Sequence, residues 1–205
     1  MTELEKEGPA VELFVYLNER CHAEAWVKGG EVPVNPASAY RSIDRSGIYT
    51  PDENFTVDSS IPVDSVPGVR FEVSNGGVLT GSVTNNFGPQ GRLSDLHIKE
   101  YSHWDGWIMC FCTTQSRMLA KKFNGKAACV KIKNLPNLKK ALDEQLGSIS
   151  EGKHCKYTDG HLRNPFLKSS ADSWQCEYRL FWKNIGAQRR LVQLPAGTGE
   201  LVALY

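Results

Sequence analysis

Short apolar runs separated by polar and glycine-rich stretches recur along the chain and predict a protein rich in strands with few helices. The runs at 11–17 (VELFVYL) and 107–112 (WIMCFC) have strand length and are typical of strands buried on both faces. Residues 128–132 alternate apolar side chains with a lysine, the period of a half-exposed strand. Two further short strands are predicted at 189–195 and 200–205.

Three segments have the composition and spacing of helices. Residues 21–30 contain helix formers and end in two glycines, the residues that best adopt the left-handed turn after a helix. Thr114 is placed to cap a helix over 115–123, and residues 134–146 carry leucines along one stripe. The expected buried residues of the second and third helices are Met118, Leu119, Phe123, Leu135, Leu138, Leu142 and Leu146.

The middle of the chain is poor in regular patterns. Residues 35–68 are rich in Pro, Ser, Asp and Asn and predict a long loop. Asn75, Gly76 and Gly77 suit a tight turn, so residues 70–83 predict a hairpin. Because strands outnumber helices and do not alternate with them regularly, we expect an α+β fold with a split, mixed or antiparallel sheet, in a single domain over 1–205.

Composition narrows the possible functions. The 205 residues hold 24 Lys and Arg against 23 Asp and Glu, a formal charge of +1, so binding to nucleic acid or an anionic membrane would need a local patch. No apolar run approaches the ~18 residues of a spanning helix, and the first residues are acidic, so we expect a cytoplasmic protein without membrane association. The six cysteines form no CxxC pair and are expected to be reduced thiols.

The candidate chemistry lies in residues 173–184, a segment dense in aromatic residues. If this segment is one strand, its period of two puts Gln175, Glu177 and Arg179 on one face, which makes an amide, a carboxylate and a guanidinium neighbours. The structural alternative is a strand whose polar face simply meets solvent.

The order of motifs resembles the ADP-ribosyltransferase superfamily. A first strand is followed by a helix and a double glycine, then by a strand that closes in CFCTT, then by the Gln-x-Glu strand. The resemblance implies an ADP-ribosyltransferase-like fold in which Glu177 is the catalytic carboxylate and Gln175 helps to present the acceptor. Cleavage of the nicotinamide bond of NAD passes through an oxocarbenium-like ribose, which a carboxylate stabilises.

The same resemblance implies NAD contacts at two other places. Asn18 or Arg20 would follow the first strand, and Thr113 and Thr114 would form the corner that holds the ribose or the glutamate side chain. Cys112 stands where a serine is usual in the superfamily. The stretches 22–40 and 110–182 also resemble an uncharacterised bacterial domain family with a Cys-Phe-Ser strand and a late Glu-x-Glu-Tyr-Arg strand.

The predicted loop offers further groups for a dinucleotide. Tyr40, Arg41 and Tyr49 combine aromatic rings for stacking with a guanidinium for phosphate, whereas the alternative is a solvated loop in which these side chains merely pack. No metal site is expected, because the cysteines and histidines lack the paired spacing of zinc ligands.

The sequence therefore favours a mono-ADP-ribosyltransferase that uses NAD as substrate and modifies a macromolecular acceptor, either nucleic acid or protein. The resemblance suggests a bacterial toxin, a phage-defence factor or a phage host-takeover factor. A non-catalytic binding or inhibitor protein with a degenerate ADP-ribosyltransferase-like fold is the alternative.

Overall fold

A computed structural model describes residues 11–40, 105–159, 164–184 and 186–205 with their side chains. For residues 56–61, 78–84 and 95–101 it describes the backbone alone. The predicted turn at Asn75–Gly77 lies outside the described residues, as do the predicted NAD-binding residues Arg41 and Tyr49.

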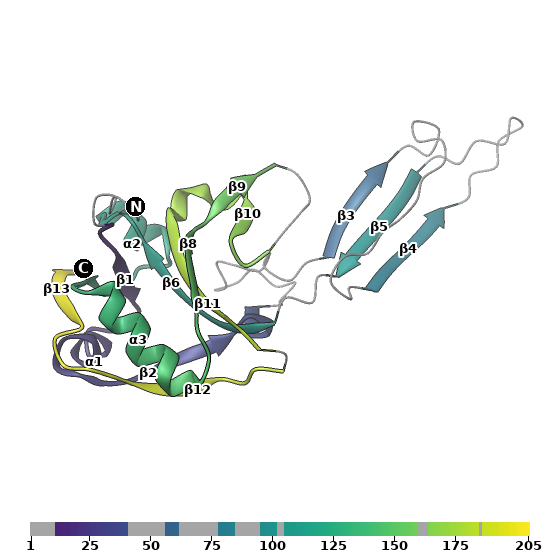
Figure 1. The fold of residues 1–205 in the computed structure, drawn as a ribbon. Helices are drawn as coiled ribbons and strands as arrows, with labels where there is room; N and C mark the ends of the chain where they lie inside the picture. Colours follow the sequence, from purple (N-terminus) through teal and green to yellow (C-terminus); the bar gives the residue numbers. More distant parts are fainter. Residues whose placement is uncertain are drawn as a thin grey trace, which may run out of the picture.

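The main sheet contains eight strands and is antiparallel at every pairing (Figure 1). Its strand order is β12-β2-β6-β1-β7-β13, and β11 joins β6 while β8 joins β11. The strands of this sheet are β1 (Phe14–Leu17), β2 (Gly30–Pro36), β6 (Gly106–Cys112), β7 (Ala128–Ile132), β8 (Glu151–His154), β11 (Glu177–Lys183), β12 (Arg190–Leu194) and β13 (Gly199–Leu204). With few short helices beside it, this sheet confirms the α+β class.

Two smaller sheets complete the strands. A parallel pair consists of β9 (Lys156–Thr158) and β10 (Leu167–Ser169). A separate antiparallel sheet has the order β3-β5-β4, formed by β3 (Thr56–Ile61), β5 (Asp95–Tyr101) and β4 (Val78–Thr84). The prediction of a continuous loop over 35–68 is therefore wrong at β3. Strand β4 pairs with β5, which follows it in the chain.

Helices α1 (His22–Lys28) and α3 (Leu135–Leu146) contribute to the larger apolar core. Asn134 caps α3, because the amide of Asn137 donates to Asn134 Oδ1 at 2.9 Å, and Gly147 ends it at φ 67°. The predicted stripe of α3 is confirmed, since Leu138, Leu142 and Leu146 are buried and Leu135 packs against them from a half-buried position.

The prediction for α2 (Arg117–Lys122) needs two corrections. Ser116, not Thr114, caps this helix: the Met118 amide donates to Ser116 Oγ at 3.1 Å. Met118 is 68% exposed, whereas Phe123 at the end of the helix is buried. Met118 and Phe123 are five residues apart, so they point to different sides of the helix and cannot both face the core.

Strand β1 is shorter and less covered than its apolar sequence suggests. It begins at Phe14, and Val15, Tyr16 and Leu17 are half-buried. The sequence predicts that the run 11–17 is buried on both faces of the sheet, but in this run only Leu13 and Phe14 are buried.

The predicted strand over 173–184 divides at Cys176. Residues Ser170–Gln175 form a 3₁₀ helix, η3, and β11 starts at Glu177. Cys176 has φ 46°, in the left-handed region, which reverses the chain direction between the two elements.

The two faces of the main sheet differ. Alternate residues of β6 and β11, such as Phe111 and Leu180, face the larger core with α1 and α3. The opposite side carries three directly paired positions, namely Phe181 with Ile108, Arg179 with Cys110 and Glu177 with Cys112. We call this side the Glu177 face.

Candidate active site

Three strands meet at Cys112, the last residue of β6. Cys112 is paired with Phe14 of β1 on one side and with Glu177 of β11 on the other. Directly paired residues point to the same side of a sheet, so these three side chains share the Glu177 face. The three strands that the sequence motifs singled out are therefore neighbours, with β6 in the middle (Figure 1).

Glu177 lies in a buried ion cluster with Arg179 and Lys168. Its Oε2 atom accepts from Arg179 Nη2 at 2.6 Å, from Arg179 Nε at 2.9 Å and from Lys168 Nζ at 3.1 Å. The side chains of Lys168 and Arg179 are 0% exposed and that of Glu177 is 5% exposed. The structural alternative, a polar strand face that meets solvent, is wrong here, because these groups lie inside the protein.

The cluster keeps the carboxylate ionised. Burial alone would raise the pKa of Glu177, but the neighbouring Arg179 and Lys168 charges outweigh burial and hold this pKa below its ordinary value of 4.5. All contacts of the carboxylate with described residues fall on Oε2. Within the described chain Ser150 Oγ is the single buried side-chain oxygen or nitrogen without a hydrogen-bond partner, so Oε1 of Glu177 is not a buried orphan. Oε1 accepts no hydrogen bond from a described residue.

Gln175 is held by the same lysine. Lys168 Nζ donates to Gln175 Oε1 at 2.6 Å, and Gln175 Nε2 donates to Asp172 Oδ1 at 3.2 Å. Gln175 is 0% exposed. Gln175 and Glu177 are therefore brought together as expected, but through Lys168 and a turn at Cys176 rather than along one strand.

Strands β9 and β10 and the residues beside them cover the cluster. Lys168 comes from β10, and the Glu177 amide donates to the hydroxyl of Tyr157 in β9 at 2.9 Å. Cys155 donates its amide to the Glu177 carbonyl at 2.8 Å, and its thiol lies 3.7 Å from Oε2. Burial is the main reason that the pKa of Tyr157 is raised.

The Thr113–Thr114 corner lies beside Glu177. The amide and the hydroxyl of Thr113 donate to the Cys176 carbonyl at 2.9 and 3.1 Å, so the corner fixes the residue before Glu177. The carbonyl of Thr114 accepts from the Tyr16 hydroxyl at 3.0 Å. Both threonines line a cavity of about 490 Å³, which Glu12, Phe14, Gln115, Lys131 and Val202 complete.

Asn18 and Arg20 are exposed residues after β1. The Lys126 ammonium donates to Asn18 Oδ1, and Arg20 donates to the Tyr205 carbonyl at 3.5 Å. Tyr16 is the first-strand polar residue that shares a side with Phe14 and hence with Glu177. Burial raises the pKa of the Tyr16 hydroxyl, and Cys112 and Cys129 contribute to that rise.

Tyr40 lies on the Glu177 face at the other end of β11. It packs in a small apolar cluster with Ala37, Ile108 and Phe181, and its hydroxyl accepts from Asn35 Nδ2 at 3.3 Å. Phe181 and Glu177 are four residues apart on one strand, or about 13 Å. Tyr40 is thus placed on the same side as Glu177 without touching it.

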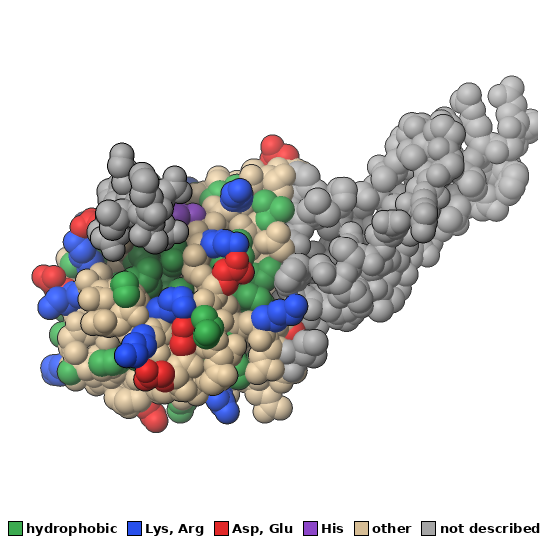
Figure 2. Space-filling view, viewed as in Figure 1, with side chains coloured by type: hydrophobic (Ala, Val, Ile, Leu, Met, Phe, Trp, Pro, Cys, Tyr) green, Lys and Arg blue, Asp and Glu red, His purple; other side chains and the backbone are tan. Residues whose placement is uncertain are grey.

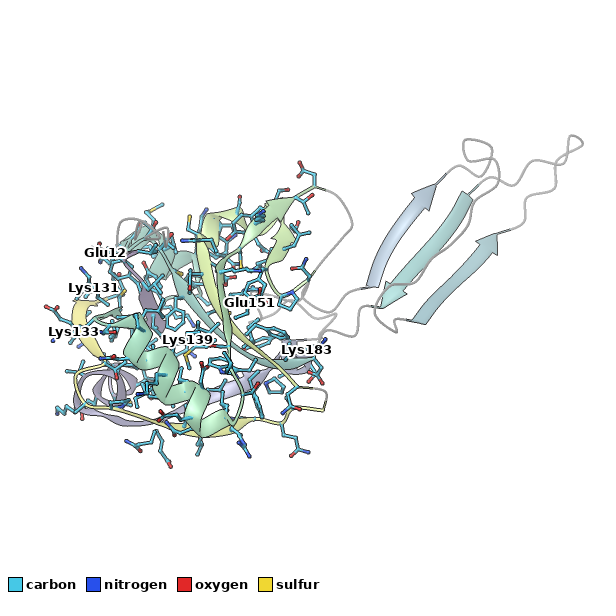
Figure 3. The ribbon with its side chains drawn as sticks, viewed as in Figure 1. Glu12, Lys131, Lys133, Lys139, Glu151 and Lys183 are labelled. Carbon is cyan, nitrogen blue, oxygen red and sulfur yellow. The ribbon has the colours of Figure 1, made fainter. Side chains whose placement is uncertain are left out.

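A larger cavity of about 990 Å³ opens at the edge strand β8. Glu151 and Lys183, labelled in Figure 3, are among the residues that line it. Neither Glu177 nor Gln175 lines this cavity or the smaller one. These two cavities therefore do not open onto the carboxylate of the ion cluster.

The residues that could hold a metal lie elsewhere. In the described ranges, Glu19, Cys21 and His22 form one group whose ligand atoms lie within 4.8 Å of one another, all exposed between β1 and α1. A hydrogen bond from the Cys21 thiol to Glu19 is the main cause of the raised pKa of Cys21. This group is remote in type and place from the Glu177 cluster.

Sequence reasoning missed Lys168, which holds both Gln175 and Glu177. Its neighbours Phe166 and Leu167 are apolar, and a lysine beside such a short apolar run is the signal that could have marked it as buried.

None of the described helices is long and apolar enough to cross a membrane. No family model matches the chain, and no curated protein or solved structure matches it either.

Proposed function

We propose that the chain is an NAD-dependent mono-ADP-ribosyltransferase that transfers ADP-ribose to a macromolecular acceptor. The observation that carries this proposal is the convergence at Cys112, where the first strand, the Cys-Thr-Thr strand and the glutamate strand pair side by side. The order of the motifs along the sequence does not by itself require these strands to be adjacent, so their pairing is additional support for the proposal.

The transfer breaks the bond between C1′ of the nicotinamide ribose and the pyridinium nitrogen. The bonding electrons leave with nicotinamide, which becomes neutral, and a nucleophile of the acceptor forms a bond to C1′ and gives its proton to solvent. Positive charge develops on the ribose in between. An ionised carboxylate at the ribose hydroxyls stabilises that charge, and the low pKa of Glu177 keeps it ionised at neutral pH.

The neighbouring residues position Glu177 in this proposal. Arg179 and Lys168 fix Oε2, which leaves Oε1 for a ribose hydroxyl. Thr113 fixes the Cys176 carbonyl next to Glu177. Gln175 would orient the acceptor, and Tyr40 would contact the dinucleotide from the far end of the same face.

A second candidate function has its own observation. Oε2 of Glu177 is saturated by buried cations, and Glu177 lines neither described cavity. These facts favour a non-catalytic binding or inhibitor protein that retains the fold of a transferase with a degenerate site.

The deciding experiment measures nicotinamide release from NAD by the purified protein, with and without cell lysate. We expect release by the wild type and a loss of about 10²–10³-fold in Glu177→Gln. Thr113→Val is the second variant, since it keeps the side-chain shape and removes only the hydroxyl that fixes Cys176. We expect it to fold and to lower turnover.

Each outcome has a distinct meaning. Glu24→Gln is the matched control, because it removes a carboxylate from an exposed ion pair with Lys28 on α1, away from both cavities, and it should leave turnover unchanged. Wild-type protein that binds NAD without releasing nicotinamide would favour the non-catalytic candidate. Absence of both turnover and NAD binding would refute the transferase.

A further inference from the structure

The cavity at the free edge of β8 has a size and a lining that the proposed transferase site does not use. At about 990 Å³ it lies at the upper end of the ~300–1,000 Å³ range of ligand sites. Strand β8 pairs with β11 alone among the described strands, so its other edge borders the cavity. The lining residues are Ile149, Glu151, Gly152, Lys153, His154, Lys156, Asn164, Pro165, Phe166, Leu167, Tyr178, Phe181 and Lys183.

The charged lining residues are mostly positive. Among the described lining residues, three lysines, Lys153, Lys156 and Lys183, stand beside one carboxylate, Glu151. On the face drawn in Figure 2, acidic and basic side chains of the described residues are interspersed. Lys153 and Glu151 form an exposed ion pair, a contact that solvent and a competing anion can exchange.

Aromatic rings line the same cavity as these lysines. His154 and Tyr178 stand edge to face with ring centres 5.1 Å apart, and His154 is exposed. Phe166 packs on Phe181 at 6.3 Å, and the ammonium of Lys153 lies 5.5 Å from the centre of the Phe166 ring. Lysines and partly exposed rings that line one cavity match a ligand that alternates phosphates with planar bases.

We propose that this cavity binds single-stranded nucleic acid. The lysines contact phosphates and the rings of His154 and Tyr178 accept stacked bases. An acidic peptide would use the lysines and leave the rings unused, and a duplex hides its bases from them. The inference stands whether or not the chain transfers ADP-ribose.

The cavity is joined to the Glu177 cluster through one side chain. Arg179 donates from Nη1 to the Pro165 carbonyl at 2.8 Å, at the cavity lining, and from Nε and Nη2 to Glu177. If the proposed transferase function also holds, nucleic acid bound in this cavity lies next to the Glu177 cluster and is the acceptor that we expect.

The test measures the fluorescence anisotropy of a labelled oligothymidine with the full chain. Three phosphate contacts predict that affinity falls about twentyfold between about 50 and about 200 mM salt, because the logarithmic slope is about −0.7 per contact for single strands. The variant Lys153→Gln, Lys156→Gln, Lys183→Gln should lose this salt dependence and bind at least about tenfold more weakly. His154→Ala should weaken binding about fivefold.

The matched control is Lys28→Gln, Lys121→Gln, Lys133→Gln, which removes the same charge from exposed sites outside the cavity. Lys28 is itself in an exposed pair with Glu24, as Lys153 is with Glu151. Equal weakening by both triple variants would overturn the proposal in favour of diffuse charge attraction. Displacement of the probe by oligoglutamate as readily as by unlabelled oligothymidine would overturn it in favour of an acidic peptide, and no binding by the wild type would refute it outright.

Discussion

The substitution Glu177→Gln tests the buried ion cluster directly. Glutamine keeps the shape and one carbonyl oxygen of the side chain and removes its charge. Arg179 and Lys168, both 0% exposed, then lose the negative charge of Glu177. Removing one partner of a buried ion pair costs about 3–5 kcal/mol, because an uncompensated charge remains in the interior.

This cost is large enough to measure against an exposed pair. For a chain of this length, 1 kcal/mol lowers the melting temperature by about 2–4 °C, so Glu177→Gln should lower it by about 6–20 °C. Glu12→Gln removes the partner of Lys131 in a pair whose side chains are 61% and 35% exposed. It should cost less than about 1 kcal/mol.

The assay is urea unfolding followed by circular dichroism, with thermal melting as a second measurement. The double variant Glu177→Gln, Arg179→Met should recover part of the loss, since it removes one of the stranded cations. A melting temperature of Glu177→Gln within the range of Glu12→Gln would refute the reasoning, because a carboxylate that balances two buried cations cannot be that dispensable.

Three more outcomes follow from the same structure. Since the pKa of Glu177 is held below 4.5, its stabilising contribution is complete above that pH and disappears as pH falls through the lower folded value, so urea midpoints of wild type and Glu177→Gln should converge in acid. Asp143→Ala leaves Trp182 Nε1 and the Ser150 amide without the Oδ1 acceptor that they reach at 2.6 and 3.0 Å, and urea unfolding should show a loss of about 1–3 kcal/mol. Cys176→Gly removes the steric strain of a non-glycine residue at φ 46°. Its free energy of unfolding in urea should therefore rise by up to about 1 kcal/mol, and a fall would contradict the strain.

Elements with complete local signals could be predicted from the sequence. Helix α3 has a capping asparagine, a proline in its first turn, a leucine stripe and a terminal glycine, and each of these signals acts within a few residues. Strand β6 followed from its unbroken apolar run. The proximity of the Thr113 corner to Glu177 is consistent with the motif order, although periodicity alone does not place the two strands side by side.

The burial of Gln175, Glu177 and Arg179 could not be predicted in the same way. A period of two looks identical for a strand face in solvent and for one covered by other elements. The covering elements are two strands of three residues each, too short for a recognisable pattern, and they bring in Lys168. The turn at Cys176 was equally hidden, because cysteine carries no preference for the left-handed region.

The charge balance of the cluster connects its structural role with its proposed chemistry. Two buried cations contact one carboxylate, so Glu177 serves first to make the burial of Arg179 and Lys168 tolerable. The two cations attract the pyrophosphate of a dinucleotide, but they weaken the stabilisation that the carboxylate gives to a cationic ribose. Catalysis at Glu177 therefore has to depend on Oε1 facing the ribose more closely than either cation does. Measuring stability and nicotinamide release in the same variants separates these two roles. If Glu177 is purely structural, its substitution lowers stability and the wild type releases no nicotinamide.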